Sequence, residues 1–258
     1  MVESVRSPRG RRHQILDVVR SNGDIDVAQL ATLLTVSVET VRRDLAALEG
    51  QGLVRRSYGK VSAVESGAFE TSLAARELIN PQEKIFIADA IVEHLGTAQT
   101  IFLDEGVQML FVAERLPLEY PLTVVTSSLP IATLLAGRVN TQVIMLGGRV
   151  RGNTLGVVDA WTVELLGRLN IDLAIIGANG VSIESGMTTP DPSVAAIKSA
   201  AIRRATRAVF VGAHHKFGRR TFVTFAQLNE FEVVLTGREL GASAARRFSD
   251  AGAPIRLV

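Results

Sequence analysis

The first sixty residues place apolar side chains at the spacing of short helices. In residues 12–19, Ile15, Leu16 and Val19 recur three and four positions apart, which is the spacing of one helical face. The run Ser-Asn-Gly at residues 21–23 consists of turn-forming residues. We therefore predict a first helix over residues 12–19 that ends before this turn.

Two further helices are predicted after that turn. Residues 27–34 carry leucines on one side and follow Asp26, a residue type that caps helix N-termini well. Ser37 is a second N-cap of this kind. It precedes a third predicted helix over residues 38–49.

The third predicted helix has one apolar and one polar face. Its apolar residues keep a three-four-three spacing and form a narrow stripe of Val38, Val41, Leu45 and Leu48. Arginine can donate paired hydrogen bonds to guanine or hold a phosphate, and threonine can reach a phosphate or a thymine methyl. A helix that packs its stripe on two short helices and exposes such side chains is typical of a DNA-recognition helix. The candidate DNA contacts at this helix are Ser37, Thr40, Arg42 and Arg43.

A basic hairpin is predicted after the third helix. The helix ends at the Gly-Gln-Gly of residues 50–52, and residues 53–61 read LVRRSYGKV, which favours two short strands with a turn. A hairpin in this place would be the wing of a winged helix-turn-helix. It would lie along the phosphate backbone or enter a minor groove. Its candidate DNA contacts are Arg55, Arg56, Tyr58 and Lys60.

Charge supports this interpretation modestly. The first sixty residues carry ten Lys and Arg against seven Asp and Glu, whereas the whole chain has 28 against 26. The positive excess therefore lies where a module that binds a polyanion needs it. Two exposed arginines also occur on ordinary solvated helices, so the order of helix, turn, helix and basic hairpin is what favours DNA binding.

Residues 11–61 resemble the DNA-binding domain of the DeoR family of bacterial repressors. The resemblance is densest over VSVETVRRDLAALEGQGLVRR, residues 36–56. At the wing the family tends to have Arg-x-His-Gly-Gly, and this chain has RSYGK at residues 56–60. The tip remains basic and able to form hydrogen bonds.

The rest of the chain predicts a linker and an α/β domain. Residues 62–73 are small and polar without periodicity, and from residue 81 short β-rich runs alternate with helical patterns. Strands are predicted at residues 100–103, 122–126, 142–146, 173–176, 208–211 and 233–235. Helices are predicted at residues 82–94, 108–116, 130–136, 161–169, 193–206 and 242–250. The predicted organisation is a winged helix-turn-helix (residues 1–62), a linker (63–80) and a doubly wound, mainly parallel α/β sensor domain (81–258).

The loops after the predicted strands are polar and rich in glycine. Ligands of doubly wound sheets bind outside the carboxyl ends of the strands, and glycine lets backbone N–H groups approach an anion. Strand ends need turns in any protein, so only the five loops together favour an anion-binding edge. Candidate effector-binding residues are Asp104, Gly106, Ser127, Gly147, Gly148, Asn179, Lys198 and Lys216. The two lysines are the candidate cations.

This half resembles the sensor domain of the same family, which is related in fold to ribose-5-phosphate isomerase and sugar-phosphate deaminases. The matching segments are FLDEG (102–106), VVTSSLPIA (124–132), LGGRV (146–150), the D-x-A-x-x-G-A-N-G run (172–180) and HKFG (215–218). The resemblance implies a transcriptional repressor of a carbohydrate or related metabolic operon. It would bind a double-stranded DNA operator without a cofactor, and a small anionic metabolite, a sugar phosphate in particular, would release it.

The first strand-end loop departs from the family pattern. The family commonly has Asp-x-Gly-Thr-Thr there, whereas this chain has DEGVQ at residues 104–108. Two alternatives therefore stay open. One is a regulator that has lost its response to a ligand. The other is an isomerase-like or deaminase-like enzyme with a DNA-binding front end, in which Asp104 and Glu105 could supply a base. The loops show no clear pair of a general acid and a general base. We therefore expect that the chain is not an enzyme.

His214 and His215 raise the question of a metal. Adjacent residues of a strand point in opposite directions, and no acidic or cysteine cluster stands near them in the sequence. We therefore expect no metal site.

The remaining features concern location and assembly. The chain has no cysteine, no apolar run of the ~18 residues that span a bilayer, and no apolar stretch behind its basic N-terminus that could act as a signal peptide. A cytoplasmic protein without membrane contact is expected. Helix-turn-helix proteins usually bind paired half-sites, so a homo-oligomer, a dimer or higher, is also expected.

Overall fold

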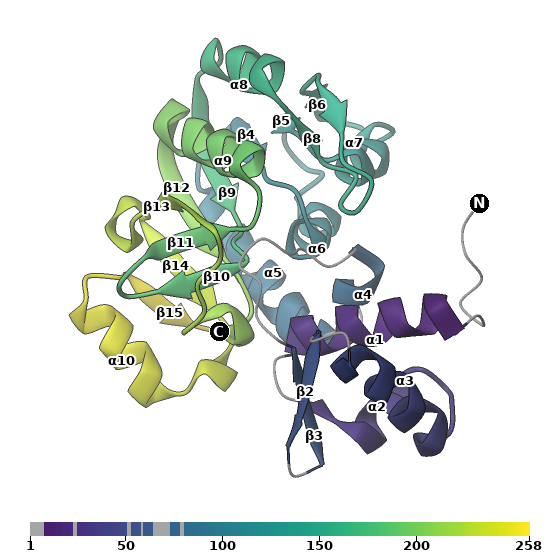
Figure 1. The fold of residues 1–258 in the computed structure, drawn as a ribbon. Helices are drawn as coiled ribbons and strands as arrows, with labels where there is room; N and C mark the ends of the chain where they lie inside the picture. The colour runs from purple at the N-terminus through teal and green to yellow at the C-terminus, as the bar shows by residue number, and fades with distance from the viewer. Residues whose placement is uncertain (1–7, 23–24, 51–52, 58, 64–72, 78–79) are drawn as a thin grey trace. The chain divides into compact units, whose positions relative to one another are not determined.

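The computed structural model describes residues 8–22, 25–50, 53–57, 59–63, 73–77 and 80–258. The chain divides into two compact units, residues 1–79 and 80–258 (Figure 1). Among the described residues, no helix combines the length and apolar character needed to cross a lipid bilayer.

The first unit is a small helical domain with a three-stranded sheet. Its elements are α1 (Pro8–Asn22), β1 (Ile25–Asp26), α2 (Val27–Leu33), α3 (Val38–Gly50), β2 (Val54–Ser57), β3 (Lys60–Ala63) and α4 (Leu73–Glu77). The antiparallel sheet has the order β1-β3-β2. The short helix α4 lies within the segment predicted as a linker.

The core of this unit forms from the stripes that the sequence predicted. Ile15 and Val19 of α1, Leu30 of α2, and Val41 and Leu45 of α3 are fully buried in one cluster. Val38 was predicted as part of the stripe of α3 but is exposed, because it is the first residue of the helix. The predicted helix-turn-helix with a wing is confirmed.

The second unit is built on a seven-stranded parallel sheet in the order β15-β14-β12-β9-β4-β5-β6. These strands are β4 (Thr100–Leu103), β5 (Leu122–Thr126), β6 (Thr141–Met145), β9 (Ile171–Ile176), β12 (Ala205–Val211), β14 (Val233–Thr236) and β15 (Ile255–Leu257). The main helices are α5 (Pro81–Leu95), α6 (Val107–Arg115), α7 (Leu129–Leu135), α8 (Ala160–Gly167), α9 (Pro192–Arg204) and α10 (Ala242–Asp250).

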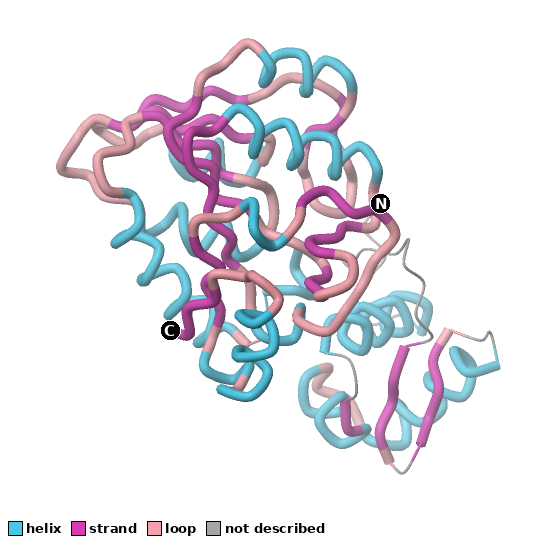
Figure 2. The backbone as a smooth tube through the Cα atoms, turned by 90° about the vertical axis from the view of Figure 1, so that its left-hand side faces the viewer, coloured by secondary structure: helices cyan, strands magenta, loops and turns pink. Residues whose placement is uncertain are grey.

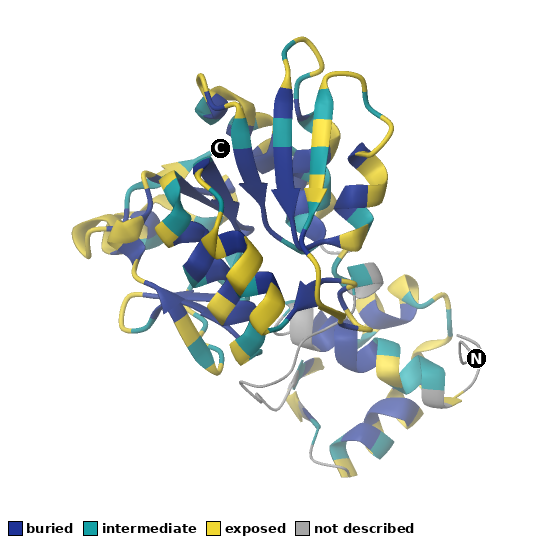
Figure 3. Cartoon of the chain, turned by 90° about the horizontal axis from the view of Figure 1, so that it is seen from above, coloured by how far each residue is buried: buried dark blue, intermediate teal, exposed yellow. Residues whose placement is uncertain are grey.

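Helices cover both faces of this sheet (Figure 2). Successive strand residues face opposite sides, so Ile101 and Leu103 pack with α5, α6 and α7, while Phe102 packs with α8, α9 and α10. The central strands are buried on both faces, as Figure 3 shows in dark blue. The doubly wound, mainly parallel α/β prediction is therefore confirmed.

Smaller elements sit on the carboxyl side of the sheet and beside it. The strands β7 (Arg149–Val150) and β8 (Val157–Val158) form an antiparallel ribbon. A second antiparallel sheet consists of β10 (Gly180–Ser182), β11 (Gly186–Thr189) and β13 (Val223–Ala226). The turns η1 (His214–Lys216), η2 (Leu228–Glu230) and η3 (Arg238–Leu240) are short 3-10 helices. The sequence patterns predicted none of these elements.

One element boundary differs for a visible physical reason. The pattern predicted a helix over residues 193–206, but α9 ends at Arg204 and β12 begins at Ala205. Ala205 pairs with Ile171 of β9, so the last two residues of the predicted helix belong to the parallel sheet instead.

At the same end of β9, Asp172 accepts hydrogen bonds from the backbone N–H groups of Thr100 and Gln99. These hydrogen bonds lower the pKa of Asp172.

Candidate functional site

The N-terminus of α3 presents the predicted DNA-contact residues together. Ser37 caps the helix: its hydroxyl accepts from the Thr40 N–H at 3.2 Å and lies 2.8 Å from the Thr40 hydroxyl. Arg42 and Arg43 are exposed, opposite the buried Val41 and Leu45. The helix therefore offers two guanidinium groups and two hydroxyls to solvent on a rigid support.

The two arginines differ in their contacts. The Arg42 Nη1 lies 4.0 Å from Glu39 Oε2, a loose pair between two exposed side chains. Arg43 forms no hydrogen bond or ion pair within the described part of the chain. Arg43 is therefore the readier of the two to bind a base or a phosphate.

A buried ion pair that the sequence did not reveal anchors α3. Asp44 is buried, and its Oδ2 lies 2.5 Å from Arg11 Nε of α1, with Arg12 Nε 3.8 Å from Oδ1. Asp44 follows Arg43 directly, so this pair fixes the rotation of α3 about its own axis. The fixed rotation keeps Arg43 on the solvent side.

The wing residues are only partly available for DNA. Arg56 Nε donates to Glu49 Oε2 at 2.7 Å, and the Arg56 N–H donates to Glu49 Oε1 at 3.1 Å. These hydrogen bonds from Arg56 hold the pKa of Glu49 below its usual value. Lys60 is exposed at the turn of the hairpin. The side chain of Arg55 and the whole of Tyr58 lie outside the described residues.

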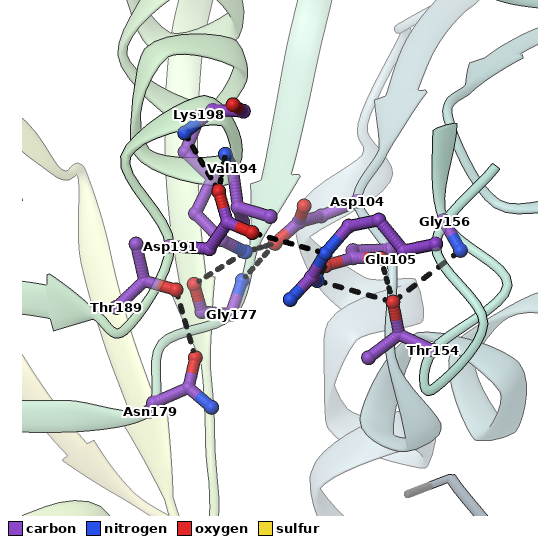
Figure 4. Close-up of polar contacts among 12 residues, drawn as sticks. Asp104, Glu105, Thr154, Gly156, Gly177, Asn179, Thr189, Asp191, Val194 and Lys198 are labelled. Carbon is purple, nitrogen blue, oxygen red and sulfur yellow. Dashed lines mark hydrogen bonds and ion pairs between the residues drawn. The ribbon is translucent and has the colours of Figure 1, made fainter. Parts of the chain in front are cut away.

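In the second unit the strand order reverses between β4 and β9, and the predicted effector residues begin there. Asp104 follows β4 and Gly177 follows β9, and the Gly177 N–H donates to Asp104 Oδ2 at 2.9 Å (Figure 4). Ligands of doubly wound sheets bind at such reversal points. The geometry thus brings two of the predicted loops together.

Lys198 of α9 is held inside this junction. Its Nζ pairs with Asp104 Oδ2 and donates to the Gly177 carbonyl at 3.1 Å, and it lies 5.6 Å from the centre of the Phe225 ring. Asp104 and Lys198 are both buried. Two of the three ammonium hydrogens therefore have protein acceptors.

A second ion network beside this junction was missed by the sequence analysis. Arg151 is buried and lies 3.1 Å from Glu105 Oε1 and 3.2 Å from Asp191 Oδ2, the N-cap of α9. Thr154 donates to the other Glu105 oxygen at 2.8 Å. The three segments that meet here are far apart in sequence. The Glu105 carboxylate is thus neutralised by Arg151.

The other predicted effector residues lie along the same edge, and several of their polar groups already form hydrogen bonds within the protein. The Ser127 carbonyl accepts from the Val157 N–H at 2.6 Å, and the Asn179 amide oxygen accepts from the Thr189 hydroxyl at 3.1 Å. Gly106 forms the N-cap of α6. The Gly147 carbonyl accepts from the Thr162 hydroxyl at 2.8 Å.

Gly148 is required by its surroundings. Its φ is 145°, and a Cβ there would lie 2.5 Å from Thr162 Oγ1 and 2.8 Å from the Val158 carbonyl. No larger residue fits without moving the β7–β8 ribbon. The glycine pair after β6 therefore has a structural explanation as well as a possible role in binding.

Lys216 lies apart from the Asp104 junction, on the turn η1 that follows β12. The neighbouring His215 has its pKa lowered to about 2, first by burial and then by Lys216, Arg219, Lys84 and His214. The cations Lys84, Lys216 and Arg219 therefore lie near η1, whereas the carboxylates of Asp104, Glu105 and Asp191 at the reversal point are paired with Lys198 and Arg151.

A helix-turn-helix with an exposed basic recognition helix, followed by an α/β unit with a polar strand-end edge, defines a DNA-binding transcriptional regulator. Two family models match the chain: the DeoR-like helix-turn-helix domain over residues 11–67 and the DeoR C terminal sensor domain over residues 79–238. The chain belongs to the DeoR family of transcriptional regulators.

Curated relatives match this chain over most of its length. The HTH-type transcriptional regulator GlpR of Haloferax volcanii is 34% identical over 96% of this chain and 97% of its own length. The HTH-type transcriptional regulator GolR of Listeria innocua is 28% identical over 97% of this chain and 98% of its own. The glycerol-3-phosphate regulon repressor of Escherichia coli is 27% identical over 88% of this chain and 89% of its own length.

Solved structures overlap the chain more weakly. Ribose 5 phosphate isomerase A from Neisseria gonorrhoeae covers 54% of this chain and 54% of its own, with 17% identity and a TM-score of 0.39. An overlap at that level decides nothing about activity.

Proposed function

We propose that this chain is a repressor that binds operator DNA through α3 and the β2–β3 wing and is released by a small phosphorylated metabolite. The DNA-binding domain spans residues 1–62, the linker 63–80 and the sensor 81–258. The observation that carries the proposal is the polar face of α3, where Thr40, Arg42 and Arg43 stand opposite the buried Val41 and Leu45. Chromosomal DNA as the partner places the protein in the cytoplasm.

The effector is a polyol or sugar phosphate in this proposal. The name of the Escherichia coli relative supports a link to glycerol 3-phosphate metabolism. The edge suits such a molecule in this proposal, because the ammonium of Lys216 attracts the phosphate and the carboxylate oxygens at the reversal point accept hydrogen bonds from hydroxyl groups. Backbone groups of Gly106, Gly147 and Gly148, together with Ser127 and Asn179, flank the ligand, and Lys198 contributes its remaining ammonium hydrogen.

Catalysis is not part of the proposed function. A general base has to be free to accept a proton from substrate, but Asp104 is buried against Lys198 and the Gly177 N–H. Glu105 is bound by Arg151 and Thr154. Incubation of the purified chain with pooled sugar phosphates should leave them unchanged, and a new isomer or released ammonia would establish the enzyme alternative.

A homo-oligomer completes the proposal. Paired half-sites on DNA require two recognition helices, and a two-fold dimer supplies them at a fixed spacing. Light scattering of the full chain should give a mass of at least twice that of one chain.

Replacement of Lys216 should uncouple effector binding from DNA release. The Lys216 ammonium is the main group that attracts the phosphate in this proposal. Its loss in Lys216→Ala should therefore abolish the release of DNA by glycerol 3-phosphate. DNA affinity without the effector should stay near that of the parent, because an effector acts through its different affinity for two states. Fluorescence anisotropy of labelled duplex DNA, with and without the metabolite, measures both quantities.

Arg238→Ala is a suitable control, since Arg238 is an exposed cation of the same unit on η3. It should respond to the metabolite like the parent. A Lys216→Ala variant that also responds like the parent would move the anion site elsewhere, and Lys198 would be tested next.

The Glu49–Arg56 pair predicts that one substitution near the wing strengthens DNA binding. Glu49→Gln should free the Arg56 guanidinium for phosphate, so DNA should bind more tightly and the slope of log affinity against log salt should steepen by about one unit. Lys60→Ala should flatten that slope by about one unit. Titrations at several salt concentrations test both variants, and slopes equal to that of the parent would show that neither wing cation reaches phosphate.

A further inference from the structure

Glu83, His214 and His215 come together on the second unit although 131 residues separate the first two. Glu83 lies in the first turn of α5, and both histidines lie on η1. Each side chain offers one ligand atom, and these atoms all lie within 4.8 Å of one another. The expectation of no metal site assumed that the histidines lie on a strand, whereas a 3-10 turn turns both rings toward α5.

Glu83 is a buried carboxylate held by His214. Its Oε1 accepts from the His214 N–H at 2.6 Å, and its Oε2 lies 2.8 Å from His214 Nδ1. In the described part of the chain it has no ion pair with a lysine or arginine. A buried carboxylate is costly unless a positive charge or several hydrogen bonds compensate it, so this position suits a cation.

His215 supplies the observation that points to a ligand. Its Nδ1 is shielded from solvent and has no hydrogen-bond partner among the described residues. Buried polar atoms are nearly always bonded, and one that is not calls for an explanation. A ring nitrogen with a free lone pair is what a metal ion coordinates.

The charges around the cluster act in both directions. Lys84, Lys216 and Arg219 are near enough to act on His215 and would repel a cation. The carboxylates of Glu83 and Glu239 oppose this repulsion. Both lie against Gly237, because a Cβ atom on that glycine would lie 2.5 Å from Glu83 Oε1 and 2.3 Å from Glu239 Oε2. The Glu83 carboxylate would be a direct ligand, so its attraction would act at the shortest distance from the ion.

We infer that Glu83, His214 and His215 form a site for one divalent transition-metal ion of the Zn²⁺ class. Two imidazoles and one carboxylate are the ligands that Zn²⁺ and its neighbours in the first row prefer, whereas Mg²⁺ and Ca²⁺ prefer oxygen alone. Three protein ligands leave a fourth position for water or an exogenous ligand. The site shares the turn η1 with Lys216 of the proposed effector site, and zinc titration without the metabolite tests it separately.

Zinc titration of the full-length chain tests this inference. The chain must carry no histidine tag and must first be freed of metal with a chelator, and a chromophoric chelator then competes for Zn²⁺. We expect one Zn²⁺ per chain. His215→Ala should weaken binding by at least about 10-fold, because loss of a ligand costs no less than loss of a group that only orients one.

His94→Ala is the matched control, since His94 lies on the same helix as Glu83 but bonds Arg256 instead. It should bind Zn²⁺ like the parent. Circular dichroism checks the fold of each variant, and Glu83→Gln, which keeps the side-chain shape, decides the question if His215→Ala does not fold. Absence of stoichiometric Zn²⁺ in the parent, or equal affinity in the ligand variants and the parent, overturns the inference.

Discussion

Arg43→Ala should reduce specific DNA affinity more than any other single change on the first unit. A bidentate contact from arginine to a base contributes ~1 to 3 kcal/mol of discrimination, or roughly 5- to 150-fold in affinity. Arg43 is exposed on α3 and makes no competing contact among the described residues, while the Asp44–Arg11 pair fixes the helix that carries it. Binding of a selected operator duplex, measured by anisotropy, gives the loss directly.

The comparison with non-specific DNA separates base contact from phosphate contact. If Arg43 reads a base, Arg43→Ala should lose specific affinity while non-specific affinity changes little. Arg168→Ala serves as the control and should bind like the parent, since Arg168 is an exposed arginine at the C-cap of α8 that pairs with Glu164. Parent-like operator affinity in both Arg42→Ala and Arg43→Ala, with the fold intact, would contradict the assignment of α3.

Lys198→Ala should destabilise the second unit by about 3 to 5 kcal/mol, because it leaves the buried Asp104 carboxylate without its cation. The Gly177 carbonyl would also lose a hydrogen bond. Urea unfolding followed by far-ultraviolet circular dichroism measures this, since the second unit holds most of the helices and strands that the structure describes.

A double variant distinguishes the ion pair from simple packing. Replacement of a whole buried pair by apolar residues is often close to neutral, so Asp104→Leu combined with Lys198→Met should be more stable than Lys198→Ala. Lys216→Ala removes a less buried lysine and should cost far less. A loss below about 1 kcal/mol for Lys198→Ala would show that the pair is not a structural anchor.

The recognition helix could be predicted from sequence because its signals are local. The caps and the 3.6-residue period act within one helix, and Ser37, Val41 and Leu45 carry them within nine residues. The parallel strands could be predicted for a similar reason, since their apolar runs are short, buried on both faces and separated by helical patterns. Thr100–Leu103 and Leu122–Thr126 have the predicted bounds.

The polar contacts of the sites could not be predicted in this way. Arg151 meets Glu105 and Asp191 across 46 and 40 positions of the chain, and Glu83 meets His214 across 131. No local pattern encodes such pairs, because the sheet topology brings their strand ends together. Lys198 and Asp104 were both predicted as effector-binding residues, but the ion pair between them was not predicted.

The short elements were missed for a third reason. The strands β1, β7 and β8 have two residues each, too few for a period to be visible. They form because an antiparallel partner is already in place, as Ile25 pairs with Val61 and Arg149 with Val158.

We propose that this chain binds a specific DNA sequence and releases it when a phosphorylated metabolite is bound. Selection of random DNA duplexes by the full-length chain, followed by elution with glycerol 3-phosphate or with unphosphorylated glycerol, tests it most directly. We predict that a repeated half-site is enriched and that the phosphorylated compound alone elutes it. Enrichment of no sequence above the starting pool would contradict the account.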